Sequence, residues 1–204
     1  LKSPPSSLRT RPTTSRIRES LMNILKEKLI GSHLLDICSG SGVISCEVLQ
    51  KGAERVLAIE QDKKTAQICK QNLLTTASGL THKAYVEVIC AEAVRFLSKG
   101  RHQKAIKEKI TNEGYGQFDL VYLDPPYESE IYSSILQSLV QGDWLREECV
   151  VICEHAAKQS INKPSEWIIK DERLYGKSQL LFISPPKSCF FDIGSKLQQK
   201  GPTQ

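Results

Sequence analysis

Apolar and polar positions along the chain follow two periods, one typical of strands and the other of helices. Short apolar runs predict strands at 33–38, 55–60, 84–90, 118–123 and 150–154. Helical spacing predicts helices between and after them, at 43–52, 64–77, 91–97 and 130–140. Strands that alternate with helices form parallel βαβ units, whereas residues 167–183 predict two strands joined by a Tyr-Gly-Lys-Ser turn. We therefore predict a doubly wound α/β domain with a mostly parallel sheet and an antiparallel carboxyl-terminal hairpin.

The two ends of the chain depart from this central pattern. Residues 1–12 are rich in Pro, Ser and Arg, and Thr13 or Thr14 can cap a helix that follows. That helix carries an apolar stripe made of Ile17, Leu21, Ile24, Leu25 and Leu29. The chain thus divides into a basic amino-terminal extended segment and helix at 1–32, a central domain at 33–184 and a flexible tail at 185–204.

The composition fits a single hydrophobic core. The 204 residues are 40% hydrophobic, which suits a single domain. No apolar run approaches the length of a membrane span, and no signal peptide is visible. The seven cysteines form no CxxC pair and fall mostly in apolar runs, so we predict reduced core thiols and no metal site. Trp144 and Trp167 are predicted to pack in the core.

Positive charge gathers in two segments, and the formal net charge is +5. The first nineteen residues contain Lys2, Arg9, Arg11, Arg16 and Arg18 but only one acid, Glu19. A second group of lysines and an arginine lies at 99–109. Such clusters bind nucleic acid or form a solvated face, and in the first segment some arginines could instead pair with Glu19.

A glycine-rich turn follows the strand at 33–38, in the sequence "LLDICSGSG". Gly40 and Gly42 carry no side chain that would block a ligand from the backbone. The dinucleotide fingerprint needs a third glycine where Ser45 stands, so that pattern is incomplete. Glu60 ends the next strand, where an acid can accept hydrogen bonds from both hydroxyls of a ribose. Each feature alone is also typical of a tight turn or a surface acid, but together they predict a nucleotide-like cofactor.

The stretch "VYLDPPYES" ends the strand at 118–123 abruptly, because proline cannot donate to a strand ladder. Pro125 and Pro126 therefore hold Asp124 and Tyr127 at the carboxyl edge of the sheet. Ligands bind at that edge in open α/β sheets. A plain turn with Tyr127 in the core is the alternative.

Four segments, "LDICSGSG", "AIEQD", "CAEAVRFL" and "DLVYLDPPY", resemble the successive motifs of S-adenosylmethionine-dependent methyltransferases that modify an exocyclic or amide nitrogen. More narrowly, "LRTRPTTSRIRESLMNIL", "GSGVISCEVLQKGA" and "LDPPY" resemble the bacterial and plastid enzymes that methylate guanine N2 of 16S ribosomal RNA, the small-subunit methyltransferase D type. The resemblance covers about residues 1–182. It implies a Rossmann-like methyltransferase fold, a monomer, and a bacterial cytoplasm or plastid stroma as the location.

The resemblance also implies roles for the matching residues. The methionine end of the cofactor pocket would be shaped by Asp36, Ser39, Gly40, Ser41 and Gly42. Glu60 would hold the ribose, and Glu92 with Ala93 would border the adenine. The catalytic segment would comprise Asp124, Pro125, Pro126 and Tyr127. Contacts to 16S ribosomal RNA, free or in an assembling small subunit, would come from Arg9, Arg11, Arg16 and Arg18.

The chemistry of guanine explains why such a segment would be needed. The lone pair of N2 is delocalised into the ring, so the nitrogen becomes nucleophilic only when its hydrogens are held. Asp124 and the carbonyl of Pro125 can accept those two hydrogen bonds, and Tyr127 can stack on a base turned out of unpaired RNA. A DNA adenine-N6 methyltransferase and a non-catalytic RNA-binding module of the same fold remain as alternatives. Glu154 could line the substrate pocket or simply end its strand.

Overall fold

The structure, a computed structural model, describes residues 1, 14–102, 115–126 and 129–189, apart from the side chains at 129 and 130. Arg9, Arg11, Tyr127, most of the second basic group and most of the predicted tail therefore lie outside the described residues. In the described part of the chain, no helix is long and apolar enough to cross a membrane.

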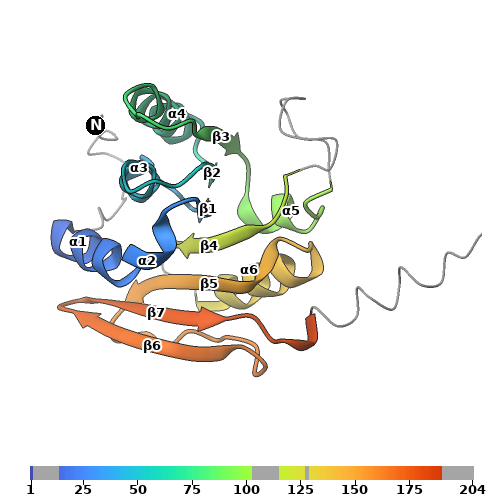
Figure 1. Cartoon of the computed structure of the whole chain (residues 1–204). Coiled ribbons are helices and arrows are strands. Elements are labelled where there is room, and N and C mark those ends of the chain that lie inside the picture. The colour runs from blue at the N-terminus through green and yellow to red at the C-terminus, as the bar shows by residue number, and fades with distance from the viewer. Residues whose placement is uncertain (2–13, 103–114, 127–128, 190–204) are drawn as a thin grey trace, which may run out of the picture.

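A seven-stranded sheet forms the middle layer, with the strand order β3-β2-β1-β4-β5-β7-β6 (Figure 1). The strands are β1 (His33–Ile37), β2 (Arg55–Glu60), β3 (Tyr85–Cys90), β4 (Phe118–Leu123), β5 (Leu145–Ala156), β6 (Ile168–Tyr175) and β7 (Ser178–Ser184). β1 to β5 pair in parallel, and β7 pairs antiparallel with both β5 and β6. This arrangement confirms the predicted mostly parallel sheet and its antiparallel hairpin. The strand order reverses between β1 and β4, which is where open α/β sheets bind ligands.

Helices cover both faces of the sheet (Figure 1). One face carries α1 (Ser15–Ile24), α2 (Lys26–Leu29), α3 (Val43–Gln50) and α4 (Lys63–Ser78), and the other carries α5 (Ala93–Leu97) and α6 (Ser129–Gln141). Each face of the sheet packs against its helices to form a hydrophobic core. Because side chains alternate along a strand, Leu34 packs with the first set of helices and Leu35 with the second. Trp144 and Trp167 are buried in the second core, as predicted.

The amino-terminal helix begins where the sequence predicted. The hydroxyl of Thr14 accepts a hydrogen bond from the amide N–H of Ile17, which caps α1. Ile17, Leu21 and Leu25 are buried, but the prediction was wrong for Ile24, which is 41% exposed. The buried stripe is shifted toward Met22, so Ile24 lies at its rim.

Candidate cofactor and methyl-transfer site

The turn after β1 is fixed by backbone shape and by contacts with α4. Cys38, Gly40 and Gly42 all have positive φ angles, of 62°, 54° and 75°. A Cβ atom at Gly42 would lie 2.5 Å from the Leu73 side chain and 2.7 Å from the sulfur of Cys69. Glycine is therefore required at this position for α4 to pack so closely. On the same helix, the side-chain amide of Asn72 donates to the carbonyl of Ser41 (2.9 Å).

Ser45 has a structural reason to stand where the dinucleotide fingerprint has glycine. Its hydroxyl donates to Oδ2 of Asp36 over 2.5 Å, and both side chains are buried. Burial raises the pKa of Asp36 to about 6, and the hydrogen bonds from Ser45 oppose that rise. A glycine could not make the side-chain bond. The sequence shows the departure but not its cause, because Asp36 and Ser45 lie on different elements.

Glu60, at the end of β2, connects two backbone segments. Its Oε2 accepts from the amide N–H of Gly40 (3.0 Å), and its Oε1 accepts from the amide N–H of Asp62 (2.8 Å). Burial raises the pKa of Glu60. Each carboxylate oxygen has further lone-pair capacity, so the fixed carboxylate can still accept hydrogen bonds from two ribose hydroxyls.

Glu92 has a local role that the sequence did not reveal. Its two carboxylate oxygens accept from the amide N–H groups of Val94 (2.9 Å) and Arg95 (2.7 Å), so the exposed side chain caps α5. The next residue, Ala93, is buried. The adenine contact of this pair stays a prediction.

Asp124 follows β4 directly, as the two prolines require. Leu123 is in register with Ile37 of β1, and the amide N–H of Asp124 still donates to the carbonyl of Ile37 (3.4 Å). The Asp124 side chain is half-buried, Pro125 is buried and Pro126 is exposed.

Four predicted acids converge around the thiol of Cys38. Burial first, and then the negative charges of Glu60, Asp124, Asp36 and Glu92, raise its pKa to about 12. The structure thus brings the carboxyl ends of β1, β2 and β4 and the start of α5 to one place. Their negative charge favours a cationic ligand, and the positively charged sulfonium and ammonium groups of S-adenosylmethionine fit that requirement.

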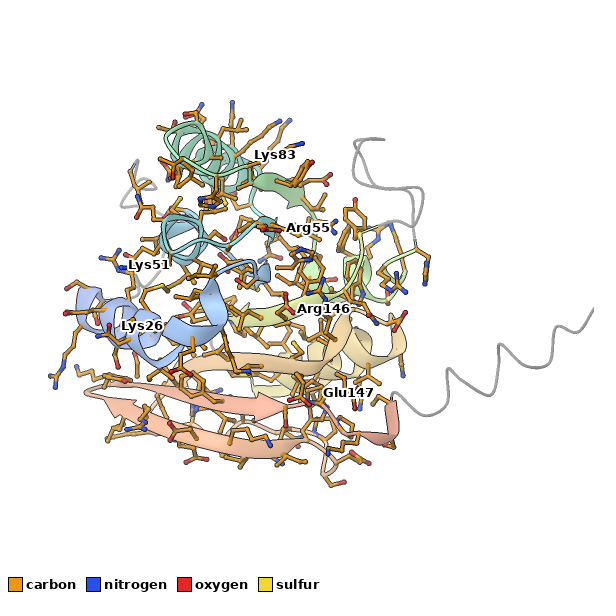
Figure 2. All side chains as sticks on the ribbon, in the orientation of Figure 1. Lys26, Lys51, Arg55, Lys83, Arg146 and Glu147 are labelled. Carbon is orange, nitrogen blue, oxygen red and sulfur yellow. The ribbon has the colours of Figure 1, made fainter. Side chains whose placement is uncertain are left out.

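The described arginines of the amino-terminal segment behave differently from each other. Nη1 of Arg18 donates to Oε1 of Glu47 on α3 (2.5 Å), so its partner is not Glu19. Arg16 is exposed. Lys26 and Lys51 lie on the same side of the molecule as α1, α2 and α3 (Figure 2).

Comparison with known proteins identifies several similar sequences. A protein-family model described as Conserved hypothetical protein 95 matches residues 1–184. "Ribosomal RNA small subunit methyltransferase D" of Buchnera aphidicola subsp. Baizongia pistaciae is 31% identical over 166 residues, which are 80% of this chain and 75% of that protein. The Escherichia coli K12 protein of the same name is 28% identical over 174 residues, 85% of this chain and 78% of that protein.

Solved structures share the fold. "Putative methyltransferase yhhF from Escherichia coli" superposes with a TM-score of 0.70 at 22% identity, covering 86% of this chain and 89% of that one. The rRNA methyltransferase aviRa from Streptomyces viridochromogenes superposes with a TM-score of 0.65 at 13% identity, covering 93% of this chain and 91% of that one. At these identities the likeness concerns the fold alone.

Proposed function

Because the chain belongs to the family described as Conserved hypothetical protein 95, we propose that it transfers a methyl group from S-adenosylmethionine to N2 of a guanine in 16S ribosomal RNA. The similar proteins named ribosomal RNA small subunit methyltransferase D support ribosomal RNA as the substrate. The observation that carries the proposal is that the ends of β1, β2 and β4 lie side by side, with Glu60 bound to the amide of Gly40 and Asp124 directly after Leu123, the partner of Ile37.

The cofactor residues that we propose are those of the turn and its neighbours. They are Asp36, Ser39, Gly40, Ser41, Gly42, Glu60, Glu92 and Ala93. Bound there, S-adenosylmethionine would supply an electrophilic methyl group, and its sulfur would keep the electron pair of the broken S–C bond. The turn is held by α4 and by Glu60 before any ligand arrives, which limits the ordering cost of binding.

The catalytic residues that we propose act on the amino group of guanine. The carboxylate of Asp124 and the carbonyl of Pro125 accept its two N–H groups, which aims the nitrogen lone pair at the methyl group. Pro126 fixes the turn, and Tyr127 stacks on the base. N2 loses one proton as it gains the methyl group, and the Asp124 carboxylate, already its hydrogen-bond acceptor, can take up that proton and pass it to water.

The proposed RNA contacts come from Arg9, Arg11, Arg16 and Arg18. We propose that the protein acts as a monomer on 16S ribosomal RNA, free or in an assembling small subunit, in a bacterial cytoplasm or a plastid stroma.

Labelled S-adenosylmethionine incubated with ribosomal RNA and with DNA tests the proposal. Both nucleic acids are then digested, and the labelled nucleoside is identified by mass and chromatography. We expect N2-methylguanosine from the RNA and no labelled product from the DNA. A methyladenine as the labelled product would contradict the assignment.

A further inference from the structure

Glu154 is a buried acid beside the proposed site, and the reaction described above does not use it. Its side chain, two residues before the end of β5, is only 4% exposed. Oε2 accepts a hydrogen bond from the hydroxyl of Tyr122, and the hydroxyl of Tyr132 donates to the main-chain carbonyl of Glu154 (2.7 Å). Two tyrosines from different elements therefore hold this residue in place.

The register of the sheet puts Glu154 next to the catalytic segment. Cys153 pairs with Leu123, so Glu154 lies one residue beyond the last position at which β5 pairs with β4, beside Asp124. Neighbouring strands lie about 4.8 Å apart, so two such side chains can reach adjacent atoms of one base. Because side chains alternate along a strand, Glu154 shares a face of the sheet with Tyr122 and with α1.

A second buried polar group lies on the same face. Glu154 pairs with Leu180 of β7, and Ala156 pairs with Ser178, which makes Ser178 a diagonal neighbour of Glu154. Ser178 is 1% exposed, and its hydroxyl has no hydrogen-bond partner among the residues that the structure describes. Buried polar groups that lack partners in the protein indicate a place for a polar ligand.

The amino-terminal helix lies close to these groups. The hydroxyls of Ser20 on α1 and Tyr175 at the end of β6 share a hydrogen bond. Ser178 follows the short turn after Tyr175. The segment proposed to contact RNA therefore leads directly into a helix that is bound to this part of the sheet.

A carboxylate distinguishes guanine from the other purine by the direction of its hydrogen bonds. A carboxylate only accepts, and it can accept several hydrogen bonds. Guanine presents N1–H and the N2 amino group side by side as donors, whereas adenine presents an acceptor at N1. An ionised carboxylate placed against N1 would attract guanine and repel adenine.

We propose that Glu154 accepts the N1–H of the target guanine while Asp124 accepts from N2, so that Glu154 determines base specificity. The assignment rests on the proposed function and deepens it. Tyr122 positions the carboxylate, and the hydroxyl of Ser178 adds a polar contact on the same face.

The test uses an RNA fragment that contains the guanine methylated by the wild-type protein and a second fragment with 2-aminopurine at that position. 2-Aminopurine keeps the amino group, but its N1 is an acceptor. The proteins are the wild type, Glu154→Gln and Glu147→Gln. Glu147→Gln is the matched control, because it makes the same change at an exposed position near the start of the same strand (Figure 2).

The wild type and Glu147→Gln should prefer guanine to 2-aminopurine by on the order of a hundredfold in kcat/KM, since a buried acceptor cannot pair with another acceptor. Glu154→Gln should reduce this ratio at least about tenfold, because its amide can rotate to donate to N1. Cofactor affinity and melting temperature should match those of the control.

An unchanged ratio in Glu154→Gln would overturn the assignment while leaving the proposed function intact. If Glu154→Gln melts early, Tyr122→Phe replaces it: a reduced ratio supports the assignment, and a wild-type ratio overturns it. A wild-type protein that methylates guanine N2 in no ribosomal RNA would overturn the proposed function and this assignment together.

Discussion

The strands β1 to β5 all begin at one edge of the sheet, the amino edge, and end at the other, the carboxyl edge. Both edges carry charged residues, but they differ in whether opposite charges pair. At the amino edge, Asp119 accepts two hydrogen bonds from Nη1 of Arg146 (2.7 and 2.8 Å) and one from the amide N–H of His33 (2.8 Å). At the carboxyl edge, Asp36, Glu60 and Glu92 accept from backbone amides or a hydroxyl, and no ion pair joins them to a cation of the described chain.

The amino edge also neutralises its most buried cation. Arg55 lies over the ring of Phe118, 5.5 Å from its centroid, and Glu87 acts against the lowering of its pKa by burial. Arg55 and Arg146 both occupy this edge, at the starts of β2 and β5 (Figure 2). Charges at the amino edge thus pair with each other, whereas Asp36, Glu60 and Glu92 at the carboxyl edge have no cationic partner among the described residues, as expected of a site for a cationic ligand.

The largest expected effect concerns the reaction at the carboxyl edge. Asp124→Ala should lower turnover about 100- to 1,000-fold, because its hydrogen bond to N2 strengthens in the transition state. Single-turnover methylation of ribosomal RNA measures this, with cofactor affinity and melting temperature as controls. Methylation at a near wild-type rate would show that Asp124 is not the acceptor.

A pH effect should appear at Asp36. Its pKa is about 6 in the folded protein against 3.8 as the ordinary value, so the folded state holds its proton more tightly than the unfolded state. The wild type should therefore lose stability as pH rises from about 4 through 6, by at most about 3 kcal/mol, and Asp36→Asn should not lose this contribution. Urea unfolding of both proteins from pH 4 to 7 measures the difference. A difference that is constant with pH contradicts the burial effect.

Loss of the ribose acceptor should weaken cofactor binding by a free energy no larger than the change in stability expected at Asp36. Glu60→Ala removes charge-assisted hydrogen bonds to the ribose and releases the amide of Gly40, which should cost about 1.5–3 kcal/mol of binding free energy. Calorimetric titration with S-adenosylmethionine measures it. Unchanged affinity would remove Glu60 from the cofactor site.

The matching change at the amino edge should affect stability alone. Asp119→Ala leaves Arg146 and the amide of His33 without their acceptor, and the free energy of unfolding should fall by about 1–2 kcal/mol. Because the site lies at the opposite edge, methylation per folded molecule should stay at the wild-type value. A loss of turnover per folded Asp119→Ala molecule would show that the amino edge also contributes to methylation.

The smallest effect is expected at the amino-terminal helix. Arg16→Gln should weaken RNA binding modestly and reduce the slope of log affinity against log salt by about 1, whereas Arg18→Gln should change the slope less because Arg18 already pairs with Glu47. RNA binding across a salt series, beside a cofactor titration, separates the two. Equal salt slopes for Arg16→Gln and the wild type would show that Arg16 does not contact the RNA backbone.

The fold could be predicted from the sequence because local patterns specify most of it. Strand and helix periods located all seven strands and the helices α3 to α6, but the single predicted amino-terminal helix is divided into α1 and α2 at Leu25. The strand β5 also extends from Leu145 beyond the predicted 150–154. Its first residues alternate less regularly, and pairing of Leu145 with Phe118 of β4 extends the strand. The exposure of Ile24 depends on which side of α1 packs against the core. The spacing of apolar residues in the sequence does not determine that side.

The positions of the acids at the strand ends could be predicted from the sequence, but the contacts of each acid could not. The bond between Asp36 and Ser45, the capping role of Glu92 and the pair of Arg18 with Glu47 all depend on distances between or within folded elements. Burial of Glu154 was equally invisible, because a strand-end acid can face solvent or a core.

We propose that the carboxyl edge of the sheet, where Asp36, Glu60 and Glu92 form no ion pair with a described cation, holds the cofactor. Amide hydrogen exchange with and without S-adenosylmethionine tests it most directly. We expect slower exchange at 38–42, 60–62 and 92–95, and unchanged exchange at the amino edge around His33, Arg55, Asp119 and Arg146. Slowing confined to the amino edge, or no change at saturating cofactor, would contradict the account.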